Sequence, residues 1–377
     1  MAKPHEGPQP RVRHVLGEPT LEGLANYIQR HDIRKILCLV GAGASVQAGI
    51  PDFRSPKTGI YAKLGKYRLN DPTEAFSLAL LREDPSIFFS IVTEMDLWPG
   101  SHRPTAVHHF LRLLADEGRL LRCCTQNIDG LEGAAGLAEG LLVEAHGTFH
   151  TATCIDCRQE YDTAQLRCAN AGVLIWRCTA CGSIVKPDVV FFGESLPERF
   201  FDVFSSDTKE ADLVIIIGTS LQVRPFALLP MGVRSSVPRV IFNLERVGGR
   251  MFYLPEDVMD EKKASGREDS SSASSAAATH AEDDGIAMNG NAAATLHGNC
   301  DFDRNALEEP LLGEVASDSS SSSSEGFITE HEEALLRPAV CRDLLIRGDC
   351  QESIMRFAEC LGLGERLRDA LLEHDAR

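Results

Sequence analysis

The sequence predicts an α/β protein in which helices cover both faces of a parallel β-sheet. Short runs that are apolar at every position, such as Leu213–Ile217, recur along the chain, and segments with apolar residues at helical spacing lie between them. Strands that are buried on both faces have this continuous apolar character, because helices pack above and below them. A third observation, an acidic serine-rich stretch at 256–333, shows that the pattern is interrupted.

Seven strands are expected, each from a short apolar run. They are Ile36–Val40, Leu120–Thr125, Leu141–Glu144, Val189–Phe192, Leu213–Ile217, Val240–Asn243 and Leu344–Ile346. Helices are expected around Val107, Phe110, Leu111 and Leu114, around Ile354, Phe357, Ala358 and Leu361, and around Leu367, Leu371 and Leu372. Ligands of such sheets bind at the carboxyl ends of the strands. Apart from the cysteines, the polar motifs described below follow strands.

The stretch 256–333 has the composition of a disordered insertion. It contains 19 Asp and Glu against 4 Lys and Arg, and it therefore carries 15 of the 17 net negative charges. With few large apolar residues and no periodicity, it cannot bury enough surface to offset the entropy of ordering it. Apolar patterning returns afterwards, so we expect its ends, near Tyr253 and Leu335, to lie close together in one fold.

Composition excludes several classes of protein. A chain of 377 residues with 43% hydrophobic residues is long enough for one large or two ordinary domains and too polar for a membrane protein. Residues 1–16 lack the apolar stretch of a secretory signal, so the 12 cysteines are expected to be thiols or metal ligands. Outside 256–333 the net charge is only −2, which argues against broad attraction to nucleic acid.

A glycine-rich loop, Gly41-Ala42-Gly43-Ala44-Ser45, follows the first long strand. Glycines at this place let backbone amides approach a pyrophosphate, and a following helix adds the positive end of its dipole. The third glycine of the dinucleotide motif is displaced to Gly49, and no acidic residue lies about 20 positions after Gly41. From this loop alone, a phosphate site and a plain tight turn have equal weight.

Four cysteines form two C-x2-C pairs, and they are Cys154, Cys157, Cys178 and Cys181. Two sharp turns that present paired thiolates make a closed tetrahedral zinc site. A catalytic zinc keeps a water position and usually has a His or carboxylate ligand, so this zinc is expected to be structural, one per chain. Cys168 lies between the pairs without a partner, and we expect it to be a buried thiol.

Three further polar segments follow strands, namely Thr125–Gly130, His146–Gly147 and Gly218–Ser220. Each also has a structural interpretation, because Asn, Asp and Thr favour helix caps and a lone histidine is more often structural than catalytic. Taken one at a time, these segments do not identify a function.

Taken in order, the segments GAGASVQAGIPDFRS, TQNIDGLE, EAHGTF, the two cysteine pairs, KPDVVFFGESLP and GTSLQVRPF resemble the sirtuins, the NAD-dependent protein deacylases. The resemblance covers roughly residues 15–250 and 338–375. Within that family the chain is most similar to the cytosolic branch that deacetylates tubulin and histones, in a protozoan form. The long serine-rich insertion departs from the usual length of the family.

The resemblance implies a Rossmann-like large domain and a smaller domain with a helical module and a zinc ribbon. The large domain then comprises 1–58, 101–147, 188–255 and 334–377. The helical module comprises 59–100, the zinc module 148–187 and the disordered insertion 256–333.

The resemblance also implies that NAD binds between the two domains. The phosphates would lie along Ala42, Gly43, Ala44, Ser45 and Val46, with Gly218, Thr219 and Ser220 closing the phosphate and ribose side. The nicotinamide would lie among Asp52, Phe53, Arg54, Gln126, Asn127, Ile128 and Asp129. The adenosine would contact Asn243, Leu244, Glu245 and Cys350. Glu245 would supply the carboxylate that is missing near the glycine loop.

The chemistry that the resemblance implies needs no nucleophilic side chain. The acetyl-lysine oxygen attacks C1′ of the nicotinamide ribose and displaces nicotinamide, so positioning and desolvation matter most. His146 would accept a proton from the ribose hydroxyl, with Asn127 as the second catalytic residue. Water then completes the formation of lysine and O-acetyl-ADP-ribose. An extended edge formed by Val190, Phe191, Gly193 and Glu194 would pair with the substrate backbone.

Deacetylation of protein lysines is therefore the expected activity. The segment Phe88–Met95 lacks the Tyr-x-x-Arg pair used to remove acidic acyl groups, so acetyl or a longer aliphatic group fits better than succinyl. Mono-ADP-ribosyl transfer and long-chain deacylation are the enzymatic alternatives. A non-catalytic docking module is the other alternative, but it would tolerate loss of His146 or Asn127, and both are present.

The expected partners are acetylated proteins, with histones and tubulin as candidates. Direct binding to nucleic acid or membrane is not expected. The expected location is the cytoplasm, with access to the nucleus left open.

Overall fold

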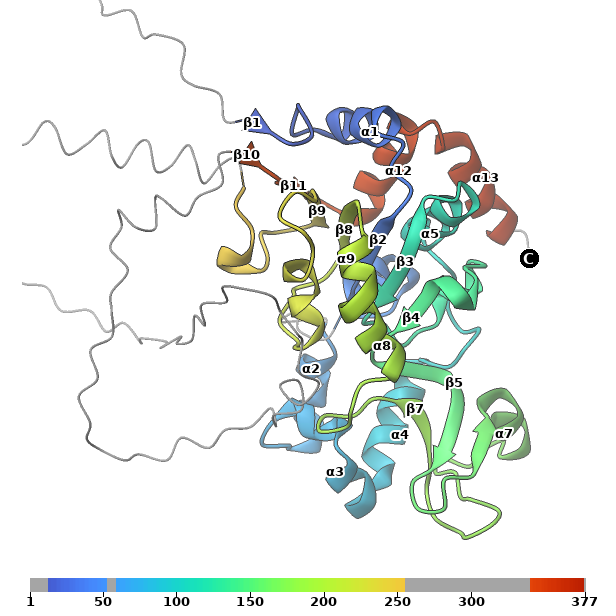
Figure 1. The fold of residues 1–377 in the computed structure, drawn as a ribbon. Helices are drawn as coiled ribbons and strands as arrows, with labels where there is room; N and C mark the ends of the chain where they lie inside the picture. The colour runs from blue at the N-terminus through green and yellow to red at the C-terminus, as the bar shows by residue number, and fades with distance from the viewer. Residues whose placement is uncertain (1–12, 53–58, 255–339, 376–377) are drawn as a thin grey trace, which may run out of the picture. The chain divides into compact units, whose positions relative to one another are not determined.

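A computed structural model describes residues 13–52, 59–254 and 340–375. The segment 256–333, for which disorder is expected, lies outside the described residues, as do Phe53 and Arg54. Figure 1 shows the two parts of the fold that the described residues form, a large parallel sheet between helices and a smaller antiparallel sheet with its own helices.

The large sheet has six parallel strands in the order β11-β9-β8-β2-β3-β4. They are β2 (Ile36–Val40), β3 (Leu120–Thr125), β4 (Leu142–Glu144), β8 (Leu213–Ile217), β9 (Arg239–Asn243) and β11 (Asp343–Arg347). The register of β2 against β8 pairs Ile36 with Leu213 and Val40 with Ile217. Six of the seven expected strands are thus confirmed, and so is the parallel α/β class.

Helices cover both faces of this sheet, as the apolar runs predict. One face packs against α1 (Leu21–Arg30), α5 (Ala106–Asp116), α12 (Cys350–Cys360) and α13 (Gly364–Asp375). The other packs against α8 (Glu198–Asp202), the π-helical turn Val203–Asp207, α9 (Thr208–Glu210) and the 3-10 turn Phe226–Met231. Alternate residues of β8 serve the two cores, with Ile215 in the first and Ile216 in the second.

The smaller sheet is antiparallel, in the order β6-β5-β7. Its strands are β5 (Gly147–Cys154), β6 (Glu160–Asp162) and β7 (Val185–Val189). Nearby helices are α2 (Ile60–Lys63), α3 (Leu78–Glu83), α4 (Pro85–Glu94), α6 (Leu131–Ala134) and α7 (Thr163–Ala169). One aromatic core, which includes Phe88, Trp98, Phe149, Trp176 and Phe191, joins the helical and cysteine-bearing segments. The division of the chain into domains by residue range stays a prediction.

Three expectations are wrong. The expected strand Val189–Phe192 ends at Val189 and belongs to the antiparallel sheet, because β7 pairs with β5 rather than with the large sheet. No α-helix directly follows the glycine loop, since Ala42–Ala44 and Val46–Ala48 are 3-10 turns. Cys168 is exposed on α7 and is not a buried thiol.

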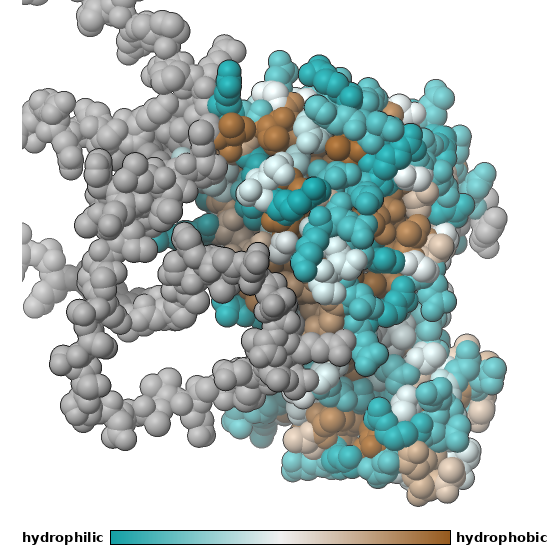
Figure 2. All heavy atoms as spheres, in the orientation of Figure 1, coloured by the Kyte–Doolittle hydropathy of each residue, from teal (hydrophilic) through white to brown (hydrophobic). Residues whose placement is uncertain are grey.

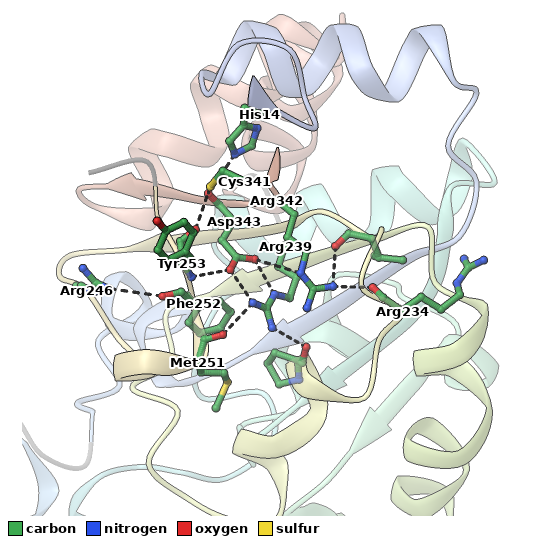
Figure 3. A network of polar contacts seen from close by, with 12 residues as sticks. His14, Arg234, Arg239, Arg246, Met251, Phe252, Tyr253, Cys341, Arg342 and Asp343 are labelled. Carbon is green, nitrogen blue, oxygen red and sulfur yellow. Dashed lines mark hydrogen bonds and ion pairs between the residues drawn. The ribbon is translucent and has the colours of Figure 1, made fainter. Parts of the chain in front are cut away.

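The described ends on either side of the insertion are joined to each other. β1 (Arg13–His14) pairs with β10 (Val340–Cys341), and the Cys341 thiol donates to the Tyr253 carbonyl at 3.0 Å. The Tyr253 amide donates to Asp343 at the start of β11, as Figure 3 shows. The chain therefore leaves and re-enters the fold at the amino ends of β9 and β11. For the described residues on either side of the insertion, this agrees with the expectation that its ends lie close together.

The outer surface carries both hydrophilic and apolar residues. On the face shown in Figure 2, hydrophilic residues predominate and apolar residues gather only in small patches, because most apolar side chains are already used in the cores. Among the described residues, no helix has both the length and the apolar composition that a membrane crossing requires.

Candidate active site and metal centre

A cavity of about 370 Å³ lies where the strands of the large sheet end. From β2 the chain builds the sheet in one direction through β3 and β4, and in the other through β8, β9 and β11. The order therefore reverses between β2 and β8, and such a switch point leaves a crevice for a ligand at the carboxyl ends of the strands. Segments that follow all six strands line the cavity.

Most residues that the sequence assigns to NAD line this cavity. They are Ala42, Gly43, Val46, Asp52, Gln126, Asn127, Ile128, Gly218, Thr219, Ser220, Asn243, Leu244, Glu245 and Cys350. The cavity is also lined by His146 and by the assigned substrate residues Val190, Phe191, Gly193 and Glu194. Ala44, Ser45 and Asp129 do not line it, and Phe53 and Arg54 lie outside the described residues. The contacts of each residue with a ligand stay predictions.

The glycine loop packs directly on the turn that follows β8. The Gly43 amide donates to the Gly218 carbonyl at 2.8 Å, and a Cβ on Gly43 would lie 2.7 Å from the Gly218 Cα. Gly218 has φ +61°, which favours glycine as well. The tight-turn interpretation is therefore correct for the glycines themselves, and the turn places Ala42 and Val46 at the cavity wall.

The side chain of Asn127 is oriented by a buried hydrogen-bond network. Its Nδ2 donates to the Gly41 carbonyl and to Ser45 Oγ, both at 3.1 Å. Ser45 Oγ donates in turn to Asp129 Oδ2 at 2.6 Å. These contacts use the amide nitrogen of Asn127 and leave Oδ1 as the atom that can accept from a ligand. Ser45 and Asp129 thus position Asn127.

His108 adds to this network through its Nε2, 3.5 Å from Ser45 Oγ, and Asp129 and Glu132 lie beside it, with one polar atom of each of the three within 4.8 Å of the others. The Thr105 amide donates to His108 Nδ1 at 3.0 Å, so the proton of the neutral ring is on Nε2. Burial lowers the pKa of His108 to about 4, which keeps the ring neutral. A protonated Nε2 cannot bind a metal ion, so we assign no metal to this cluster, in which neither carboxyl oxygen of Glu132 has a hydrogen-bond partner among the described residues.

Glu132 is an uncharged acid at neutral pH. It is 1% exposed, and burial, with the Asp129 carboxylate as the second cause, raises its pKa to about 8. A second negative charge next to Asp129 is thereby avoided.

His146 has the tautomer that a base requires. Its Nδ1 lies 3.0 Å from the Gln126 carbonyl, and because a carbonyl oxygen only accepts, Nδ1 carries the proton. Nε2 therefore has the lone pair. Burial lowers the pKa of His146, although the bond to Gln126 opposes the shift, so the ring is neutral near pH 7.

The other end of the cavity is formed by side chains that follow β8, β9 and β11. Thr219 Oγ1 donates to Gln126 Oε1 at 2.7 Å, which links the ends of β8 and β3. Asn243 Nδ2 donates to the Glu245 carbonyl at 3.0 Å. Burial raises the pKa of Cys350 to about 12, and its thiol donates to the Gly43 carbonyl at 3.2 Å. Cys350 is thus an unreactive thiol.

The four ligand cysteines come together as the spacing predicts. Cys154 and Cys181 have their sulfurs 3.5 Å apart, as do Cys157 and Cys178, and all four lie within 4.8 Å. Zn–S bonds of ~2.3 Å place tetrahedral sulfurs a little under ~4 Å apart, so the cluster fits zinc. A hydrogen bond from the Tyr161 hydroxyl lowers the pKa of Cys178 to about 6, which favours the thiolate ligand. Four sulfurs leave no position for a substrate.

Several lining residues were missed in the sequence. They are Tyr61, Phe76, Val189, Phe192, Leu196, Val223, Arg224, Val247 and Asp349. Val189 and Phe192 stand in the quoted motif KPDVVFFGESLP. Leu196, Val223 and Arg224 lie inside the quoted motifs, and Asp349 adjoins Cys350, so motif membership could have identified them. Tyr61 and Phe76 had no such signal, because the helical segment that carries them reaches the cavity only through tertiary packing.

Comparison with known proteins decides the family. Residues 41–225 match the sequence profile of the Sir2 family. The NAD-dependent protein deacetylase SIR2rp1 of Leishmania major is 54% identical over 365 residues, which are 95% of this chain and 92% of that protein. The protein of the same name from Trypanosoma brucei brucei is 49% identical over 370 residues, or 97% and 94% of the two chains. This chain belongs to the Sir2 family.

A relative from outside the trypanosomatids matches less of this Sir2 protein. The NAD-dependent protein deacetylase sirtuin-2 of Danio rerio is 48% identical over 240 residues, 63% of each chain. The two trypanosomatid alignments are too long to omit more than a small part of 256–333. The additional length of this Sir2 chain is therefore shared with those relatives, which agrees with the protozoan resemblance.

Proposed function

We propose that this protein is an NAD-dependent protein-lysine deacetylase that transfers the acetyl group to ADP-ribose and releases nicotinamide. The observation that carries the proposal is His146, which lines the cavity at the switch point with Nδ1 bound to the Gln126 carbonyl and Nε2 unprotonated. The printed names of the trypanosomatid relatives support the same activity.

NAD supplies the activated ribose carbon to which the acetyl oxygen is transferred. The protein's part is to bind, to orient and to move one proton. Asn127 presents an oriented amide oxygen, since Gly41 and Ser45 hold its nitrogen. His146 Nε2 accepts the proton of the ribose hydroxyl. Ile128, Phe191 and Val190 surround this region with apolar side chains that exclude water.

The lining favours an uncharged acyl group. Apolar side chains such as Phe76, Ile128 and Phe191 dominate it, and among the described lining residues only Arg224 is a cation. Acetyl and longer aliphatic groups therefore fit better than succinyl. Mono-ADP-ribosyl transfer, which would use the same activated carbon, is the activity that the experiment below separates from deacylation.

Acetylated proteins are the proposed partners, with histones and tubulin as the candidates that the resemblance favours. The nearly neutral charge outside 256–333 supports a protein rather than a nucleic acid as the target. We place the enzyme in the cytoplasm, with nuclear access open, because four zinc-binding thiols require a reducing compartment.

The test is mass spectrometry of acetylated, myristoylated and succinylated peptides incubated with the full-length protein, with and without NAD. We expect loss of the acetyl group and formation of O-acetyl-ADP-ribose only with NAD. An ADP-ribosylated protein together with an intact acetyl group would replace this proposal with ADP-ribosyl transfer.

A further inference from the structure

The loop that follows β7 is held by a lysine that does not line the cavity. Lys186 lies within β7, and its side chain is 9% exposed. Its Nζ donates to the Val189 carbonyl at 2.7 Å, to the Pro187 carbonyl at 3.2 Å and to Glu194 Oε2 at 3.1 Å. One ammonium therefore joins the end of the strand to the end of the loop 190–194.

Glu194 closes the loop from the other side. Its Oε2 accepts the Phe191 amide at 2.7 Å, while its own amide donates to the Phe191 carbonyl at 2.9 Å. Lys186 also lies over the Phe191 ring, 4.4 Å from the centroid, where a cation is attracted to the aromatic face. The ion pair and this ring contact both restrain residues 191–194.

The same loop is joined to the site through its backbone. The Val190 amide donates to the His146 carbonyl at 2.8 Å, and the Phe192 amide donates to the Phe76 carbonyl at 2.9 Å. The amides of Val190, Phe191, Phe192 and Glu194 thus all donate inside the protein. A peptide that adds here as an extended strand must use the loop carbonyls and the Gly193 amide, whose directions depend on the loop conformation.

Lys186 is also placed by the antiparallel pairing of β5 with β7, which reaches a zinc ligand at one end. In the β5–β7 pairing, Lys186 lies opposite Thr153, and Val185 lies opposite the zinc ligand Cys154. At the other end of the same strands, Gly147, next to His146, lies opposite Val189. The β5–β7 strand pair therefore carries Lys186 between the metal centre and the peptide loop.

We propose that Lys186 is the positioning residue for the acylated peptide, which it favours by holding loop 190–194 through Glu194. The inference rests on the proposed deacetylase function, and it assigns Lys186 to peptide binding and not to NAD binding. A buried ammonium is retained only when paired, and loss of one partner leaves the other without compensation. Without Lys186, the Glu194 carboxylate would turn to water and release the Phe191 amide.

The experiment compares wild type, Lys186→Met and Lys209→Met as full-length proteins. Methionine keeps the length of the side chain and removes its donors, and Lys209 is an exposed lysine of α9 that serves as the control. For Lys186→Met we expect the KM for an acetylated peptide to rise at least ~10-fold, with the KM for NAD within ~2-fold and zinc content unchanged. Equal rises in both KM values, or an unchanged peptide KM, would overturn the proposal.

A second variant keeps the test decisive if Lys186→Met fails to fold. Glu194→Ala removes both contacts of a side chain that is 25% exposed and lies after β7, and it should give the same selective rise in peptide KM. A wild-type peptide KM in Glu194→Ala would refute the proposal regardless of the first variant. The double variant should be no worse than Lys186→Met alone, because both changes break one contact, whereas additive effects would contradict it.

Equilibrium binding separates this inference from the proposed function. The Kd of a fluorescent acetylated peptide, measured by anisotropy without turnover, should be weaker for Lys186→Met by the same factor. If wild type binds the peptide but does not deacetylate it, the proposed function fails while the role of Lys186 is still tested. If Lys186→Met binds as tightly as wild type, the role of Lys186 fails alone.

Discussion

Arg239 and Asp343 form a bidentate ion pair in the interior of the protein, at the first residues of β9 and β11. Arg239 Nη2 lies 2.6 Å from Asp343 Oδ2, and Nε lies 2.7 Å from Oδ1. The two side chains are 5% and 2% exposed. Arg239 also donates to the Pro230 and Met251 carbonyls, so the pair joins both flanks of the insertion to the sheet (Figure 3).

Removing one partner of this pair should destabilise the protein strongly. Asp343→Asn leaves the Arg239 guanidinium buried without its counter-ion, and we expect a loss of roughly 3–5 kcal/mol in the free energy of unfolding. Urea denaturation of both proteins measures it. The control is Asp212→Asn, which breaks the exposed pair with Arg234 and should cost about 0–1 kcal/mol. Equal losses of unfolding free energy in the two variants would mean that burial does not determine how much the Arg239–Asp343 ion pair stabilises the protein.

The insertion should be removable without effect on NAD binding. Its flanks join the fold beside Asp343. Asn243 ends β9 and Cys350 follows β11, at the opposite ends of these strands, which are roughly 13 Å long at ~3.3 Å per residue. A short Gly/Ser linker in place of 256–333 should leave zinc content and the KM for NAD close to wild type, since loop closure varies only logarithmically with length. A change above about tenfold, worth roughly 1.4 kcal/mol, would make the insertion part of the cofactor site.

His146→Ala should lose deacetylation by at least ~100-fold and keep NAD binding, because a general base contributes to the reaction and not to the affinity. Turnover of an acetylated peptide and NAD titration measure the two effects. In wild type, kcat should fall as the pH drops through the pKa of His146, which burial places below the ordinary value of 6.5, since the protonated ring cannot accept. His150→Ala, at an exposed histidine of β5, should show neither change.

Zinc should be required for the smaller sheet. Cys178→Ser is expected to release the metal and unfold the smaller sheet, because structural zinc contributes folding free energy directly. Metal analysis should find about one zinc per chain in wild type and none in the variant, together with loss of activity. Cys168→Ser changes an exposed cysteine of the same segment and should retain both. A zinc-free preparation with full activity would refute the structural assignment.

Glu132 should make the protein less stable at alkaline pH. Its pKa is about 8 in the folded state and near 4.5 when exposed, so the folded protein holds a proton that the unfolded chain releases between these values. The stabilisation is complete below pH 4.5 and is lost as the pH rises towards 8. Glu132→Gln stays uncharged beside Asp129, Glu144 and His108.

The measurement is the difference in Tm between Glu132→Gln and wild type at several pH values. This difference should grow in favour of the variant by more than ~5 °C between pH 5 and pH 8. Other titrating groups cancel in the comparison, and Glu83→Gln, at the exposed end of α3, should show no trend. A difference that is flat with pH would mean that Glu132 is ionised in the folded protein.

The sequence by itself determined the parallel sheet, the metal ligands and most of the cavity lining. Strands such as β2 and β8 are apolar at every residue. This pattern is typical of strands that are covered on both faces, so the local sequence is enough to predict a sheet between two layers of helices. The cysteine pairs are equally local, because two residues between ligands bring both sulfurs to one metal. Residues after strand ends could be assigned to one site, since the carboxyl ends of parallel strands share one edge of the sheet.

Only the tertiary structure decided which sheet the segment after Val185 joins, where Cys168 lies, and how the buried charges pair. The apolar run Val189–Phe192 resembles the parallel strands, but the strand in the structure is Val185–Val189, and it pairs with β5 beside the metal centre, which its own pattern does not predict. Arg239 and Asp343 are 104 residues apart in sequence, and so no local spacing joins them. The contribution of a buried charge to stability depends on its desolvation and its partners. Both are set by the packed environment and not by neighbours in the chain.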